Sequence, residues 1–207
     1  VLRDDKHPRV RAHAVGLAER FLKEKNTADL IDALLPLVDD TSPHVRFQLA
    51  FTLGETDDPR AITGLARLAR DEQNGAEIQT ALLSSIGGSA DLMAAELLSN
   101  KGFLAKKHAS SLLSQVMLIV GVNPKPAGSL NVLARLTEKN VPLGIQQVVL
   151  AGLGEGLRRR GASLQKLLAD KATSSDVRSQ VEALFNAALR LASSQKSTLA
   201  EQVAAVR

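Results

Sequence analysis

The 207-residue chain contains no cysteine, no tryptophan and no tyrosine, and its aromatic rings other than histidine are five phenylalanines. Without cysteine it can form no disulfide, thiolate zinc site, covalent haem attachment through paired thiols or thiol nucleophile. Leucine and alanine, both strong helix formers, make up 63 of the 207 residues, whereas residues that favour sheets are scarce. The composition therefore indicates a helical protein and argues against an all-β or Rossmann-like fold.

A long hydrophobic run is also missing. The longest apolar stretch, Val116–Val122, is far shorter than the roughly 20 residues that span a bilayer, so we expect no membrane span.

Charge is unevenly distributed: residues 1–103 carry 12 Lys and Arg against 16 Asp and Glu, and residues 104–207 carry 14 Lys and Arg against 6 Asp and Glu. Such asymmetry indicates either an acidic partner for the basic half or a chain cut from a larger protein.

What the chain does contain is an internal repeat. Asp4–Arg11 (DDKHPRVR) and Asp39–Arg46 (DDTSPHVR) are identical at five of eight positions at an offset of 35 residues. An offset of 33 then aligns the apolar pattern of Val45–Gly54 with that of Ile78–Gly87. Repeats of this length are typical of solenoids, in which each repeat is one supersecondary unit.

Helix signals follow the same period. Ser42 and Asp58 each precede a proline, which combines a capping side chain with the residue preferred at the first helical position. Apolar residues then recur at helical spacing, as in Val45, Leu49 and Leu53. The predicted helix pairs are 8–24 with 27–38, 43–55 with 59–71, 76–87 with 90–99, 103–120 with 127–138, 142–160 with 163–170, and 175–193 with 197–206.

A single helix pair cannot cover its own apolar face, but pairs stacked in a row bury a continuous core. The sequence therefore predicts an all-α superhelix, an α-solenoid of about six helix pairs. We expect residues 1–207 to form one domain, with an irregular junction near 121–127, where the sequence Asn-Pro-Lys-Pro breaks the helical pattern.

The spacing Asp-x-x-Pro-x-Val-Arg, from Asp5 to Arg11 and again from Asp40 to Arg46, resembles the HEAT repeat. In that family the aspartate and arginine form a ladder of buried bonds between successive repeats. The aspartate lies where it can accept from helix-start N–H groups, and the arginine offers a planar fork to a neighbouring carboxylate. The third repeat has Gln79 in place of the arginine, so we expect the ladder to stop there.

A narrower resemblance covers Val45–Glu55, Asp58–Ala61, Leu83–Ser85 and Leu150–Gly161. These segments are similar to the HEAT region of planctomycete and verrucomicrobial membrane-bound dehydrogenase or haem-binding proteins. That family implies a β-propeller before the repeats and a cytochrome c domain with a CxxCH motif after them. It therefore implies an exported or periplasmic parent, with this chain as a spacer between the two domains. The chain has no CxxCH, so haem would belong to the parent's C-terminal domain.

Catalytic patterns are absent from the sequence. His7, His13, His44 and His108 show no metal-ligand spacing, and we interpret them as exposed or capping residues. Serine pairs fall within helical patterns, where a hydroxyl usually bonds to its own helix. The sequence predicts no catalytic residue, no metal and no cofactor in this chain, and hence a non-enzymatic function.

Acidic pairs and glycines have similar structural explanations. The pairs at 4–5, 39–40 and 57–58 precede helix starts, where negative charge and capping oxygens are favourable. The glycines near 87–88 and 152–156 follow no strand and form no phosphate-binding motif. Neither acid–base catalysis nor nucleotide binding is indicated.

Basic residues leave two functional alternatives. Arg158, Arg159 and Arg160 end a predicted helix, and a nucleic-acid-binding solenoid would use them, with the lysines of the basic half, for phosphate contacts. Such proteins need aromatic platforms for single strands, and residues 104–207 contain only Phe185. We therefore favour a module that binds protein or flanking domains, with nucleic-acid binding as the alternative.

The inner face of a solenoid is its usual binding surface. On the predicted helix 59–71, three arginines lie opposite the apolar stripe, and a fourth follows on a later inner helix. The predicted partner-binding residues are Arg60, Arg67, Arg70, Arg135, Arg158, Arg159 and Arg160.

Overall fold

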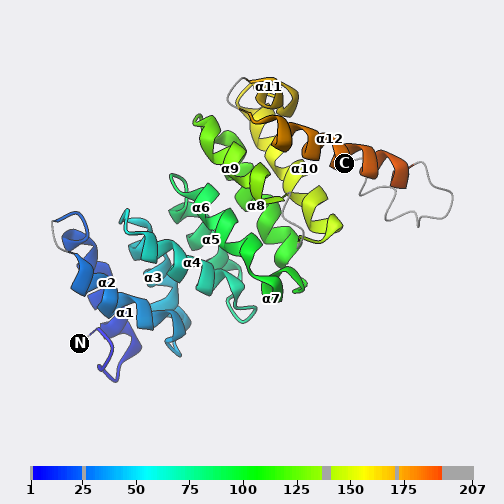
Figure 1. Ribbon diagram of the computed structural model, residues 1–207. Helices are drawn as coiled ribbons and strands as arrows, with labels where there is room; N and C mark the ends of the chain where they lie inside the picture. Colours follow the sequence, from blue (N-terminus) through cyan, green and yellow to red (C-terminus); the bar gives the residue numbers. More distant parts are fainter. Residues whose placement is uncertain (1, 25–26, 137–140, 171–172, 193–207) are drawn as a thin grey trace. The chain divides into compact units, whose positions relative to one another are not determined.

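The computed structural model describes residues 2–24, 27–136, 141–170 and 173–192, and these residues form helices and no strand (Figure 1). The predicted all-α class is confirmed. The chain divides into two compact units, Val1–Ser89 and Ala90–Arg207. The stretch 121–127, which the sequence suggested as a junction, lies inside the second unit.

The first unit consists of helix pairs in sequence order. Its elements are α1 (Pro8–Ala18), the 3₁₀ segment η1 (Glu19–Phe21), α2 (Ala28–Leu34), the 3₁₀ segment η2 (Leu35–Asp39), α3 (Pro43–Gly54), α4 (Pro59–Arg70) and α5 (Ala76–Ser85). The first helices of three successive pairs, α1, α3 and α5, pack side by side, and η2 and α4 pack on each other and on α3. This is the stacking of repeats that the period of the sequence predicts.

Proline and capping side chains position these helices. Pro8, Pro43 and Pro59 each open a helix, where the missing N–H costs no intrahelical hydrogen bond. His7 Nδ1 accepts from the N–H of Arg9 at 3.3 Å, and the Asp58 carboxylate caps α4 in the same way. The apolar stripe of α3 faces the core, with side chains that are almost completely buried.

The second unit contains α6 (Ala90–Ser99), α7 (Lys101–Leu104), α8 (Ala109–Val122), α9 (Pro126–Leu136), α10 (Leu143–Arg159), α11 (Leu164–Ala169) and α12 (Ser175–Ala192). Helix α6 packs on α8 and α9, and α8 packs most extensively on α10. Helices α11 and α12 pack on α10. No helix among the described residues is long and apolar enough to cross a membrane.

Helices α8 and α10 approach each other through glycines. A methyl group placed on Gly152 would lie 2.7 Å from the carbonyl oxygen of Ser114, and one on Gly156 would lie 2.8 Å from Gly121 Cα. By contrast, a methyl group on Gly154 would meet no atom within 4 Å. The glycines at 152 and 156 therefore serve close helix packing, which explains their spacing without a nucleotide site.

Three predicted helices differ from the structure. The predicted helix 103–120 is divided, because α7 ends at Leu104 and the turn that follows places His108 at the N-cap of α8. The predicted helix 27–38 becomes 3₁₀ from Leu35 because Pro36 donates no hydrogen bond. The predicted helix 8–24 is α-helical only to Ala18. The predicted helix 197–206 lies outside the described residues.

Candidate interaction surface

A buried arginine links the first repeat to the second. Arg11 donates from Nε and Nη2 to the two carboxylate oxygens of Asp40, at 2.8 and 2.7 Å, and from Nη1 to the backbone oxygen of Asp5 at 2.8 Å. The side chains of Arg11 and Asp40 are 10% and 6% exposed. Burial would raise the pKa of Asp40, but hydrogen bonds from Arg11 and the Ser42 N–H outweigh it and hold that pKa below its ordinary value.

The same arrangement recurs one repeat later with a different acceptor. Arg46 Nε donates to Asn74 Oδ1 at 2.8 Å, and Arg46 Nη1 donates to the backbone oxygen of Asp40. Asn74 in turn donates to the backbone oxygen of Leu68 at 2.8 Å. The structure thus brings the four predicted ladder residues into one network, in which Asp5 takes part through its backbone oxygen.

A second row of bonds joins the other helices of these repeats. Arg60 of α4 pairs with Asp32 of α2 at 2.6 Å, and Arg67 pairs with Asp39 of η2 at 2.6 Å. Both arginines were predicted to face a partner, and in the structure both make ion pairs between repeats. Each pair is exposed to solvent, so its individual contribution to stability is small. Arg70, at the end of α4, is half-buried.

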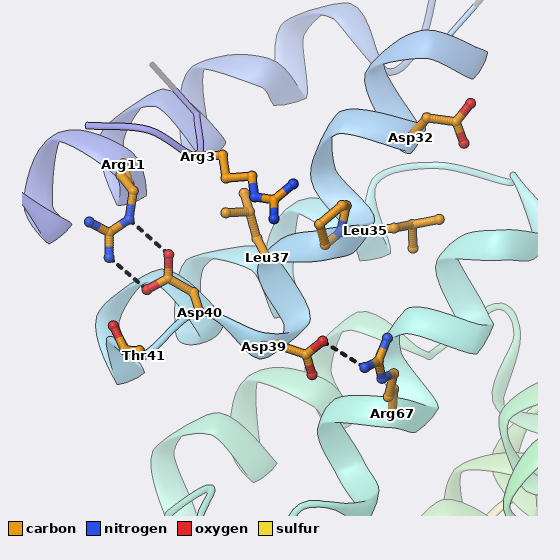
Figure 2. A pocket seen from close by; sticks show the side chains of 10 residues that line it. Arg3, Arg11, Asp32, Leu35, Leu37, Asp39, Asp40, Thr41 and Arg67 are labelled. Atoms are coloured by element: carbon orange, nitrogen blue, oxygen red, sulfur yellow. Dashed lines mark hydrogen bonds and ion pairs between the residues drawn. The ribbon is translucent and has the colours of Figure 1, made fainter. Parts of the chain in front are cut away.

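A cleft of about 670 Å³ lies between these two rows of bonds (Figure 2). Its lining residues are Arg3, Arg11, Asp32, Leu35, Pro36, Leu37, Asp39, Asp40, Thr41 and Arg67. The Arg11–Asp40 and Arg67–Asp39 pairs are drawn at its two ends, with Arg3 between them. Arg3 makes no hydrogen bond or ion pair with any residue that the structure describes. It is therefore a cation available to a ligand.

Three of the four arginines predicted to bind a partner in the second unit make contacts within that unit. Arg158 and Arg159 both bond the carboxylate of Glu155, at 2.7 and 2.9 Å, and hydrogen bonds from Arg159 and Arg158 hold the pKa of Glu155 below its ordinary value. Arg160 donates to the backbone oxygen of Asn123. Arg135 is exposed on α9. The basic cluster is therefore largely engaged within its own helix and with the end of α8.

The polar groups weighed for catalysis occupy structural positions. His7, His13 and His44 are exposed, and within the described part of the chain no three His, Asp or Glu side chains form a metal-binding group. Ser84 and Ser85 donate to backbone oxygens four residues earlier in α5, at 2.9 and 2.8 Å. These contacts agree with the helix-bonded serines expected from the sequence.

Sequence reasoning missed two ladder residues. Asn74 was overlooked because the expected partner of Arg46 was a carboxylate. Arg178 of α12 donates from Nε to the backbone oxygen of Leu168 at 2.8 Å, so it ties the end of α11 to α12. The Val177-Arg178 dipeptide repeats the Val-Arg of the first two repeats and could have indicated this role.

Comparison with known families agrees with this geometry. The family model described as HEAT repeats matches residues 1–87. The first unit is similar to HEAT repeats. Repeats of this kind generally mediate protein–protein interaction or scaffolding, and their helical fold is typically non-catalytic. No curated protein and no solved structure matches the chain.

Proposed function

We propose that the chain is a non-catalytic, protein-binding scaffold, and that the cleft of its first unit receives an acidic segment of a partner protein. The observation that carries this proposal is the unpaired Arg3 in a cleft whose other cations already have carboxylate partners. Arg11 is neutralised by Asp40 and Arg67 by Asp39. Asp32, which also lines the cleft, pairs with Arg60, and Arg60 is bonded to Asp58 as well. Among the lining residues, Arg3 is therefore the one guanidinium without a carboxylate partner, and an anionic group entering the cleft can bond to it.

The surroundings of Arg3 also favour a particular kind of segment. Leu35 and Pro36 line the same cleft and are not fully buried, so they offer apolar contact beside the guanidinium. A guanidinium forms its strongest hydrogen bonds with carboxylates, frequently through two parallel N–H donors. A segment with an acidic residue next to an apolar one fits both features.

The two rows of bonds between repeats support a scaffold role. Arg11 and Arg46 join successive first helices, whereas Arg60 and Arg67 join α2 and η2 to α4. Side chains held in this way lose little further freedom when a partner binds, which lowers the entropic cost of binding. The walls of the cleft are therefore organised before the partner arrives.

Selection from a displayed peptide library tests this proposal. We expect wild-type protein to enrich peptides rich in Asp and Glu, and Arg3→Glu to weaken their binding about tenfold or more through loss of a charge-assisted hydrogen bond. Lys6→Glu is the matched control, since it reverses the charge of an exposed residue that also precedes α1 but does not line the cleft. Dissociation constants are measured by fluorescence anisotropy at fixed ionic strength.

Enrichment of neutral or basic peptides, or equal weakening by both variants, would contradict the acidic-segment proposal.

Nucleic-acid binding is the competing function. The engagement of Arg158 and Arg159 with Glu155 argues against it, because these side chains would have to leave a carboxylate to reach phosphate. A DNA titration at two salt concentrations separates the functions, since tight and steeply salt-dependent binding would favour nucleic acid.

We also propose a finer role, in which the scaffold spaces a propeller dehydrogenase-like domain from a cytochrome c domain of an exported redox protein. Its support is the resemblance of Val45–Glu55 and Leu150–Gly161 to that family. The chain would bind no haem itself. Reading the parent open reading frame tests this role: a propeller upstream and a CxxCH motif downstream would support it, and a repair or trafficking domain would refute it.

A further inference from the structure

The second bond of the arginine ladder ends on an amide, whereas the first ends on a carboxylate. Asp40 and Asn74 hold equivalent positions at an offset of 34 residues, in the turns before α3 and α5. Asn74 is followed by Gly75, and it is the one asparagine of the chain with glycine after it. Because glycine has no side chain, its nitrogen has the least hindered approach to the amide carbon of the preceding residue. By local sequence alone, Asn74 is therefore the most reactive asparagine of the chain.

The reaction open to this sequence is spontaneous deamidation. The Gly75 nitrogen gives its proton to hydroxide and attacks Cγ of Asn74. The N–Cγ bond forms, the Cγ–Nδ2 bond breaks, and Nδ2 takes a proton from water and leaves as ammonia. Water then opens the cyclic imide at one of its two carbonyl carbons, which gives aspartate or isoaspartate. Gly75 is exposed, and its N–H donates to no described residue, so the attacking nitrogen is accessible to hydroxide.

The fold holds the side chain of Asn74 in a position that opposes ring closure. Its Oδ1 accepts from Arg46 Nε at 2.8 Å, and its Nδ2 donates to the backbone oxygen of Leu68 at 2.8 Å. Arg46 belongs to α3 and Leu68 to α4, so two helices fix this half-buried amide. Ring closure turns Cγ toward the Gly75 nitrogen and makes it tetrahedral, which moves both amide atoms away from their partners. A hydrogen bond to a charged group such as Arg46 is among the costlier ones to break.

We propose that Asn74 is a deamidation site whose reaction rate is set by the bond from Arg46. The reaction proceeds when the contact between α3 and the turn before α5 opens locally, and it is slow while that contact is closed. Its products differ in what they leave of the ladder. Aspartate keeps an acceptor for Arg46, as Asp40 does for Arg11. Isoaspartate adds a methylene to the main chain and shortens the side chain, so Arg46 loses its acceptor. Neither Asn74 nor Gly75 lines the cleft, so this inference is independent of the proposed function.

Peptide mapping by mass spectrometry tests the proposal on the full chain. The protein is incubated at mildly alkaline pH and digested briefly with trypsin, and fragmentation of the peptide 71–101 locates conversion of amide to acid. We expect conversion at Asn74 to be slow in folded wild type and about tenfold faster or more in urea, where the bonds to Arg46 and Leu68 are absent. Arg46→Ala should speed conversion in the folded protein about tenfold.

Two control variants make the test specific. Arg11→Ala removes the ladder bond one repeat earlier but keeps Arg46 bonded to Asn74, so it should speed conversion far less than Arg46→Ala. Gly75→Ala should suppress conversion both in the folded protein and in urea, because the methyl group hinders the attacking nitrogen. Alanine fits this position, since φ is −65° and the methyl group would meet only Glu77 Oε2, at 3.9 Å.

Three results would overturn the proposal. Conversion in folded wild type as fast as in urea would mean that the fold does not restrain Asn74. Equal acceleration by Arg46→Ala and Arg11→Ala, or acceleration by neither, would mean that the Arg46 bond does not set the rate. Absence of conversion in urea would mean that Asn74 is not a deamidation site. Circular dichroism verifies the helix content of each variant, and Arg46→Lys, which keeps the charge but not the planar fork, replaces Arg46→Ala if that variant does not fold.

Discussion

Replacing Leu49 with alanine is expected to lower the free energy of unfolding by about 2–5 kcal/mol. Leu49 is 0% exposed on α3, in the same buried stripe as Leu53, which lies beside Gly64 of α4. Removal of its side chain leaves a cavity between helices that are fixed by the arginine ladder and cannot collapse into it fully. Urea denaturation followed by circular dichroism measures the loss, since the chain has no tryptophan or tyrosine to report by fluorescence.

Leu17→Ala is the matched control for this experiment. It makes the same chemical change in the same unit, at a leucine that is 45% exposed. Its effect should be well below that of Leu49→Ala, because little apolar surface is lost from the interior. A loss below about 0.5 kcal/mol for Leu49→Ala would show that Leu49 is not in the core.

Gly156→Ala is expected to destabilise the second unit by about 1–3 kcal/mol. The added methyl group would overlap the carbonyl oxygen of Leu118 and lie 2.8 Å from Gly121 Cα. Both neighbours are backbone of α8, so no side-chain rotation relieves the overlap. Helices α8 and α10 would have to separate. Urea denaturation of the full chain, with the transition of the second unit followed separately, measures the change.

Gly154→Ala, on the same helix, should have the opposite sign. Its methyl group meets no atom within 4 Å, and alanine is favoured over glycine in a helix interior by up to about 1 kcal/mol. The two alanines differ only in whether they face α8. Stabilisation by both variants would mean that α8 and α10 are not in backbone contact.

The sequence was most informative where one residue type has one structural use. Pro43 and Pro59 predicted the starts of α3 and α4 because proline at the first helical position loses no hydrogen bond. The stripe Val45, Leu49 and Leu53 predicted a buried helix face at the correct register. These signals are local, so they predict helix starts and buried faces without knowledge of how neighbouring repeats pack.

Contacts that depend on residues elsewhere in the chain could not be predicted from the sequence. Arg60 and Arg67 lie on the exposed side of α4, as their spacing predicted, but their ion pairs with Asp32 and Asp39 depend on the packing of α4 against α2 and η2.

The break between α7 and α8 illustrates a third limit. The buried residues Phe103 and Leu104 come before the turn and Ala109 follows it, and Asn100 caps α7 by accepting from the N–H of Phe103 at 2.8 Å. Phe103 then packs edge-on against His108, with ring centroids 5.4 Å apart. Buried residues stand directly on both sides of this short turn, so hydrophobic periodicity alone cannot locate it.

The central claim is that an arginine from each of the helices α1 and α3 reaches the turn before the next repeat, and the bond from Arg46 to Asn74 tests it most directly. A double-mutant cycle with Arg46→Ala, Asn74→Ala and the double variant measures the coupling by urea denaturation. The account predicts a coupling energy of about 0.5–3 kcal/mol. Additive effects of the two substitutions, within about 0.5 kcal/mol, would contradict it.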